Sequence, residues 1–159
     1  MLDTATDEDL KPVIKRYLQK IYSLVFYLIG NDSDKAYQIT ASSYVETFMT
    51  LRSIGNDSEV IVNLVQEAIK QSHSVEIMPS SKVPPFKDVP PEKVQILHIL
   101  SNALQAMTFK DRALLLLRDQ LHLSFKNIAT VLGISQSDAR SHINQARIEI
   151  RKKVERALL

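Results

Sequence analysis

The sequence contains no cysteine and only three glycines among its 159 residues. Without thiols the chain can form neither a disulfide framework nor a thiolate metal site, and its composition suits a reducing cytosol. A glycine-rich phosphate-binding loop is also missing, because such a loop needs several glycines at fixed spacing. These absences exclude disulfide-stapled, thiolate-zinc and P-loop domains.

Long hydrophobic runs are absent too. The longest, around YSLVFYLIG, is far shorter than the roughly 20 residues that span a bilayer. The first residues, MLDTATDEDLKPVIKR, are acidic and lack an apolar stretch, so we expect no secretory signal. Hydrophobic residues nevertheless make up 45% of the chain and charged residues 24%, which predicts folded cores rather than disorder.

Patterns typical of catalysis are missing as well. The four histidines are scattered and form no H-x-x-x-H pair, so the sequence predicts no zinc site. No Ser/His/Asp or Cys/His constellation can be assembled from the sequence. We therefore expect no catalytic residue, no metal, no cofactor and no enzymatic activity. The histidines are His73, His98, His122 and His142.

Apolar residues recur at steps of three and four, and no segment alternates long enough to predict a strand. The fold class is therefore all-α. Three amphipathic helices are predicted before residue 73: one from about Leu10 to Leu28, one from about Ala36 to Leu51 and one from about Asp57 to Gln71. The apolar pattern of the second helix consists of Ala36, Ile39, Tyr44, Val45, Phe48 and Leu51. Glycine–Asn–Asp–Ser stretches separate them, and we interpret these as helix ends and caps rather than calcium loops.

The stretch His73–Pro90, HSVEIMPSSKVPPFKDVP, is rich in proline. Proline fixes extended backbone and removes amide donors, so we predict a semi-rigid linker. This divides the chain into a helical domain at 1–72, a linker at 73–90 and a second helical domain at 91–159. The alternative is a loop lying flat over one continuous domain.

The second domain is predicted to contain four helices and to end in a helix-turn-helix. Thr108–Asp111 and Ser135–Asp138 each resemble a capping box, and Gly133 permits a tight turn between two helices. The first of those helices has Phe125, Ile128, Ala129 and Leu132 on its apolar face, and Ala129 is small enough to let the two helices approach closely. Seven Lys and Arg but three Asp and Glu lie from Ser124 onward, a balance of +4 in a chain of net charge +2. This concentrates positive charge near the C-terminus.

The last helix should keep Ala139, Ile143 and Ala146 on its inner side and present polar side chains outward. Such side chains can bind phosphates or base edges in the major groove. The alternative is a helical hairpin with an ordinary solvated face. The candidate DNA-binding residues are Ser135, Gln136, Ser137, Arg140, Ser141, Asn144, Gln145, Arg147 and Arg151.

The segment MTFKDRALLLLRDQLHLSFKNIATVLGISQSDARSHINQARIEIRKKV resembles region 4 of bacterial RNA polymerase sigma factors, especially the extracytoplasmic-function kind. The resemblance implies that this domain binds the −35 promoter element and touches the polymerase flap. The matching positions are Leu123, Ser124, Ile128, Ala129, Leu132, Gly133, Ile134, Ser135, Ala139, Arg140, Ser141, Ile143, Ala146 and Arg147.

The N-terminal domain resembles sigma region 2 in layout but departs from it in chemistry. At DKAYQITASSYVETF, Gln38, Ala41 and Ser42 replace the polar and acidic residues that usually engage the polymerase clamp, and they are the weakly matching candidates for polymerase binding. The next helix lacks the aromatic and basic residues with which the family reads and opens the −10 element. Lys70 is its one Lys or Arg.

The sequence therefore predicts a cytoplasmic sigma-factor-like protein that binds core RNA polymerase and double-stranded promoter DNA, with an anti-sigma factor as a candidate further partner. Two modules held together would combine their specificities. The alternatives are a sigma-like transcriptional regulator that has lost promoter opening, and an interaction protein that sequesters a partner.

Overall fold

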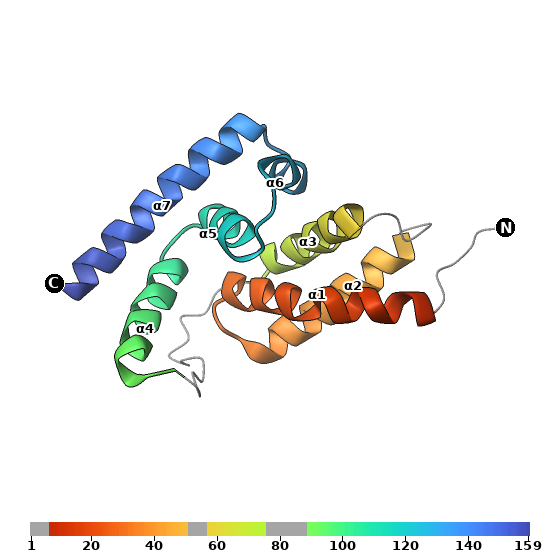
Figure 1. Ribbon diagram of the computed structural model, residues 1–159, viewed down its shortest axis with the longest axis horizontal. Helices are drawn as coiled ribbons and strands as arrows, with labels where there is room; N and C mark the ends of the chain where they lie inside the picture. Colours follow the sequence, from red (N-terminus) through yellow and green to blue (C-terminus); the bar gives the residue numbers. More distant parts are fainter. Residues whose placement is uncertain (1–6, 51–56, 76–88) are drawn as a thin grey trace.

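Figure 1 shows the computed structural model, which describes residues 7–50, 57–75 and 89–159. Over these residues the fold is all-α, as predicted. The first three helices are α1 (Asp7–Leu28), α2 (Ser33–Thr50) and α3 (Asp57–His73). α1 ends before Gly30, as expected, and the chain turns there with left-handed backbone at Gly30 and Asn31 (φ 83° and 68°).

The C-terminal part contains α4 (Pro91–Gln105), α5 (Phe109–Leu115), a π-helical turn labelled η1 (Leu116–Gln120), α6 (Phe125–Leu132) and α7 (Gln136–Leu158). Both predicted capping motifs begin helices: the Thr108 hydroxyl accepts from the Asp111 amide at 3.2 Å, and the Ser135 hydroxyl from the Asp138 amide at 3.0 Å. These bonds satisfy amides that have no partner inside the helix.

A single regular helix was expected after Thr108, but α5 ends at Leu115 and continues as the π-helical turn η1. The amide of Leu121 donates to the carbonyl of Leu116 at 3.0 Å, and that of Leu123 to Leu117 at 3.1 Å. The wider turn lets four consecutive leucines, 114–117, all be buried. The turn closes at His122, whose φ of 56° is left-handed.

Helix α2 also differs from the expected pattern. Val45, placed on its apolar face from the sequence, is 56% exposed, whereas Thr40, Ser43 and Thr47 are buried. Two of these hydroxyls bond to the helix's own backbone: Thr40 to the Ala36 carbonyl at 2.6 Å and Ser43 to the Ile39 carbonyl at 2.7 Å. Because each of these two hydroxyls has a hydrogen-bond acceptor in its own helix, burying it costs little free energy.

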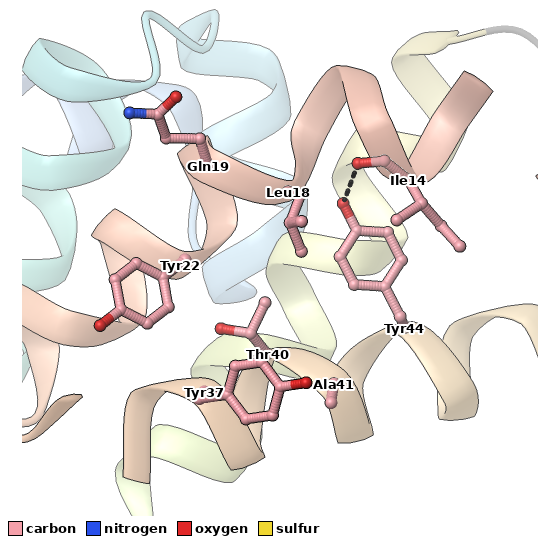
Figure 2. A pocket seen from close by; sticks show the side chains of 8 residues that line it. All are labelled: Ile14, Leu18, Gln19, Tyr22, Tyr37, Thr40, Ala41 and Tyr44. Atoms are coloured by element: carbon pink, nitrogen blue, oxygen red, sulfur yellow. Dashed lines mark hydrogen bonds between the residues drawn. The ribbon is translucent and has the colours of Figure 1, made fainter. Parts of the chain in front are cut away.

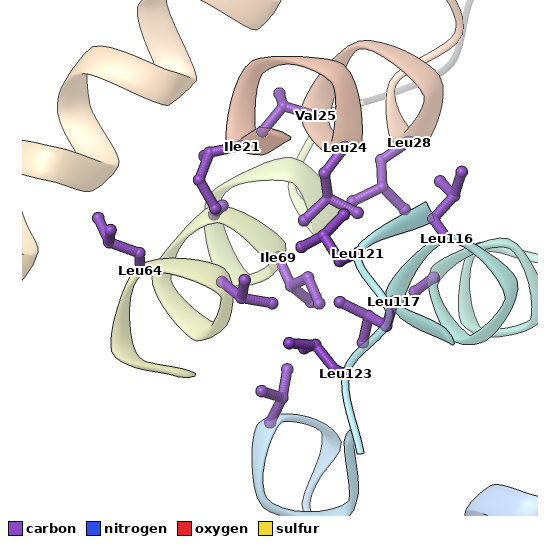
Figure 3. Packing of buried hydrophobic residues seen from close by; sticks show 14 of the residues in the cluster. Ile21, Leu24, Val25, Leu28, Leu64, Ile69, Leu116, Leu117, Leu121 and Leu123 are labelled. Carbon is purple, nitrogen blue, oxygen red and sulfur yellow. The ribbon is translucent and has the colours of Figure 1, made fainter. Parts of the chain in front are cut away.

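A continuous hydrophobic core joins α1 and α3 to the C-terminal helices. In Figure 3, Leu24 and Leu28 of α1 face Leu121 and Leu116, and Ile69 of α3 faces Leu117. A buried hydrogen bond from Asn31 Nδ2 to Ser101 Oγ (2.9 Å) adds a polar link. Residues 76–88 of the predicted linker lie outside the described residues, so the division at 72 and 91 stays a prediction.

Candidate DNA-binding and protein-binding surfaces

The helix-turn-helix is built from α6, Gly133 and α7. Ile128 of α6 belongs to the same buried cluster as Ala139 and Ile143 of α7, and Ala129 is also buried. Gly133 ends α6 in the left-handed conformation (φ 65°), and the Ile134 amide donates to the Ala129 carbonyl at 3.1 Å. No atom lies within 4 Å of where a Cβ on Gly133 would stand. The glycine is therefore required by backbone conformation, not by space.

Helix α7 buries one side and exposes the other. Ala139, Ile143 and Ala146 are buried at steps of four and three. Every predicted DNA-binding residue except Arg147 is exposed, so one solvent-facing surface carries polar and cationic side chains. We call this the recognition face; it comprises Ser135, Gln136, Ser137, Arg140, Ser141, Asn144, Gln145 and Arg151.

Arg147 lies at the margin of this surface and is bound to an acid. Its guanidinium forms a bidentate ion pair with Asp119 of η1, in which Nε donates to Oδ2 at 3.2 Å and Nη2 to Oδ1. Hydrogen bonding to Asp119 raises the pKa of Arg147 above its usual value. The pair joins α7 to η1 and offsets the charge that Arg147 would offer to DNA.

Arg140 contacts an aromatic ring that the sequence had placed on the apolar face of α6. Its Cζ lies 4.9 Å from the ring centroid of Phe125, and Cζ of Arg118 lies 4.3 Å from the same centroid. Sequence reasoning did not single out Arg118, because it precedes the helix-turn-helix and shares no helical spacing with Arg140. The fold brings them together through the irregular η1 turn.

The predicted polymerase-binding residues Gln38, Ala41 and Ser42 are all exposed on α2. Around them, Tyr37 is 70% exposed and Met49 is 76% exposed. Large apolar side chains gathered on one surface helix are a feature of protein-binding surfaces. This solvent-facing side of α2, which also includes Val45, is called the α2 face below.

An apolar groove of about 500 Å³ runs between α1 and α2, beside the α2 face. In Figure 2 four residues of each helix line it, and the Tyr44 hydroxyl donates to the Ile14 carbonyl at 3.3 Å. Burial raises the pKa of Tyr44 well above its usual range, so this hydroxyl stays protonated. The lining residues are Ile14, Leu18, Gln19, Tyr22, Tyr37, Thr40, Ala41 and Tyr44.

Helix α3, which corresponds to the −10-reading helix of the resemblance, packs against α6. Val60, Leu64 and Val65 are buried in the shared core. The helix contains no Phe, Tyr or Trp, its one aromatic ring, that of His73, packs against Phe109, and Lys70 is exposed. Stacking of unpaired bases normally uses aromatic side chains. This surface therefore offers little to single-stranded DNA.

Within residues 7–50, 57–75 and 89–159, no group of three or more His, Cys, Asp or Glu side chains is placed to hold a metal ion. None of the helices in these ranges has both the length and the apolar character needed to cross a bilayer.

Comparisons with known proteins agree with this geometry. Residues 97–150 match the family model described as sigma-70, region 4, and no curated protein matches the chain. The sigma factor RpoE, solved in complex with the anti-sigma factor NepR from Bartonella quintana, is 15% identical with a TM-score of 0.72, over 93% of this chain and 98% of that one.

A second similar structure is CnrH in complex with the cytosolic domain of CnrY. It is 10% identical with a TM-score of 0.68, over 94% of this chain and 90% of that chain. At such identities the likeness establishes the fold alone, and the family model covers residues 97–150. Residues 97–150 are thus similar to sigma-70 region 4, and the chain has the same fold as the sigma factor RpoE and CnrH.

Proposed function

We propose that this protein acts in transcription initiation, binding core RNA polymerase and docking its helix-turn-helix on the promoter −35 element. The observation that carries the proposal is the position of the region 4 match, residues 97–150, which includes all of α6 and most of the recognition face. The residues that match the family model therefore include most of a surface whose shape and charge suit DNA.

On the DNA side, the recognition face supplies donors of both kinds that a major-groove reader needs. Arg140 can bind a guanine edge or a phosphate, and Asn144 and Gln145 can pair with adenine. The inner residues of α7 are buried, so these polar side chains project from a helix that is fixed by packing. Rigid presentation reduces the entropy lost on binding.

On the protein side, we propose that the α2 face and the adjoining groove contact polymerase through Gln38, Ala41 and Ser42. Three exposed apolar side chains on one helix support this assignment. Because Gln38, Ala41 and Ser42 carry no charge, the contact would depend on apolar packing more than on ion pairs. The complex should consequently be less sensitive to salt than a charged interface.

A second function, a regulator that does not open promoters, is favoured by α3. That helix lacks Phe, Tyr and Trp, and α6 packs against it. The chain shares its fold with the sigma factor RpoE, which was solved in complex with an anti-sigma factor. An inhibitory protein partner is therefore also a candidate for this chain. Sequestration of such a partner would be the third possibility. In all three cases the protein works without catalysis or cofactor, in the cytoplasm.

Reconstituted transcription with core polymerase from the source organism tests the proposal. Core binding is measured by titration, and opening by permanganate reactivity of promoter thymines on a DNA selected in vitro. We expect core binding and −35-dependent recruitment, with weak opening. Arg140→Ala serves as the DNA-binding control. Duplex binding without core binding would decide for the regulator, and robust opening by protein and core alone would exclude it.

A further inference from the structure

The groove between α1 and α2 is lined almost entirely by apolar surface. Its volume of about 500 Å³ is typical of pockets that bind small molecules. The two hydroxyls of its wall nearest the middle are already bonded to protein carbonyls, that of Thr40 to Ala36 at 2.6 Å and that of Tyr44 to Ile14 at 3.3 Å (Figure 2). With these hydroxyls satisfied, the groove offers a ligand mainly apolar contact.

The groove has the length of a medium hydrocarbon chain. Ile14, Leu18 and Tyr22 follow one another at steps of four along α1 and line the groove from one end to the other (Figure 2). At about 1.5 Å per residue this distance is roughly 12 Å, which an extended chain of about ten carbons matches. A helix of that length and about 10 Å across would fill roughly 900 Å³, so it could not enter the groove. A single acyl chain therefore fits better than a protein helix.

The two ends of the groove carry opposite charge. Lys11 and Lys15 are exposed, and helical spacing places them beside Ile14 on the groove side of α1. Among the described residues, no acid forms an ion pair with either lysine. At the other end α2 begins with an acid, Asp34, one turn before Tyr37. An anionic amphiphile would therefore bind with its head at the lysines and its tail toward the acidic end.

We propose that this groove binds a free medium-chain carboxylate, with its hydrocarbon chain between α1 and α2 and its carboxylate paired to Lys11 and Lys15. Tyr37 and Ala41 belong both to the groove and to the α2 face, so a bound chain covers part of the surface that we assign to polymerase. The ligand site does not depend on that assignment. Its effect on polymerase does, and that effect rests on the proposed function.

Isothermal titration calorimetry of the full chain with decanoate measures the site directly. We expect a single saturable site. Octanoate, which is two methylenes shorter, should bind about tenfold more weakly, because each buried methylene changes the affinity about three- to fourfold. A second probe, 1-decanol, keeps the chain and lacks the charge.

Substitutions separate the contribution of the head from that of the chain. Lys11→Gln combined with Lys15→Gln should weaken decanoate binding about three- to tenfold and leave 1-decanol binding unchanged. Ala41→Trp fills the groove from an exposed position and should abolish binding of both probes. If circular dichroism shows that this variant is unfolded, Leu18→Gln, which places an amide in the groove at another exposed position, should weaken both. The matched control is Lys20→Gln, which removes an exposed charge from the side of α1 away from the groove and should bind as the unmodified protein does.

Titration of core polymerase with and without decanoate tests the effect on the α2 face. Decanoate should weaken core binding by the unmodified protein and should have less effect on the double lysine variant. Core binding that saturating decanoate leaves unchanged would overturn this part of the inference. A protein that binds decanoate but never binds core would refute the proposed function and leave the ligand site standing.

Absence of saturable decanoate binding, or undiminished binding by folded Ala41→Trp, would overturn the ligand site. Unchanged decanoate affinity in the double lysine variant would do the same, because the carboxylate would then lie elsewhere. Sedimentation with phosphatidylglycerol vesicles distinguishes a free ligand from a lipid surface. Pelleting with these vesicles that is lost in the double lysine variant would show that this face binds membranes instead, and would also overturn the inference.

Discussion

At the scale of single residues, Arg112 is a buried cation that hydrogen-bonds to backbone carbonyls and forms no ion pair with a carboxylate among the described residues. It is 1% exposed, and its Nη1 donates to the Met107 carbonyl at 2.9 Å, with longer contacts to the Leu104 and Gln105 carbonyls at 3.4 and 3.5 Å. Leu104 and Gln105 are the last residues of α4, where the helix dipole favours a cation, and Met107 follows the helix. Burial lowers the pKa of Arg112 below its usual value, because desolvation disfavours the charged form.

We expect Arg112→Ala to lower the free energy of unfolding by about 2–4 kcal/mol, because it empties a buried site and removes the side-chain donor to the Met107 carbonyl. Arg112→Lys should recover part of that loss, since an ammonium on a flexible chain cannot match the planar guanidinium. Urea denaturation followed by circular dichroism measures both. Equal stability of the alanine variant and the unmodified protein would contradict this role.

Arg140 and Arg147 occupy the same helix but differ in their surroundings. Arg147 is held by Asp119, whereas Arg140 is balanced by no acid among the described residues. Arg140→Ala should therefore weaken duplex binding by about 1–3 kcal/mol, and Arg147→Ala by less. Asp119→Asn should strengthen DNA binding and steepen its salt dependence by up to about 0.9, because it releases one cation to the DNA.

Anisotropy titrations at several salt concentrations check these values. Because the pair is about half exposed, Asp119→Asn should cost at most about 1 kcal/mol of stability. A loss of DNA affinity in folded Asp119→Asn would show that the ion pair orients Arg147 for DNA instead of withholding it.

At the scale of elements, the sequence predicted helices well where apolar residues recur and caps are present. The C-terminal end of α1, the capped start of α5 and the buried side of α7 agree with the expected patterns, because spacing and capping are local properties. The prediction for the buried side of α2 was wrong at Val45, which is exposed. Thr40 and Ser43 are buried instead, because their hydroxyls donate to carbonyls of the same helix. Composition alone could not reveal that.

The η1 turn shows a second limit of predicting this structure from the sequence. Leu114–Leu117 read equally well as part of a regular helix, and only the core that surrounds them requires the wider turn. The same turn brings Cζ of Arg118 to 4.3 Å from the ring centroid of Phe125, a contact that helical spacing could not predict. The exposed residues of α7, by contrast, could be assigned from helical period and from the family resemblance.

At the scale of the whole molecule, the N-terminal and C-terminal helices share a core and one buried polar link. Asn31 Nδ2 donates to Ser101 Oγ across the two halves at 2.9 Å. A double-mutant cycle with Asn31→Gly, which suits the left-handed backbone at this position, and Ser101→Ala measures the link. We expect a coupling energy of about 0.5–1.5 kcal/mol by urea denaturation. Additive effects would mean that the halves do not meet there in solution.

The shared core makes a further prediction for cleavage of the proline-rich stretch. A protease should cut first between His73 and Pro90, because proline-rich extended backbone without helical periodicity is where nicking concentrates. The two fragments should nevertheless elute together from a sizing column, since Leu24 and Leu28 of α1 pack against leucines that follow the cut. Separation should require denaturant or a Leu24→Asp substitution, which buries an unpaired carboxylate in the contact. Fragments that separate at once in native buffer would show independent modules instead, and would leave α3 open to DNA without any rearrangement.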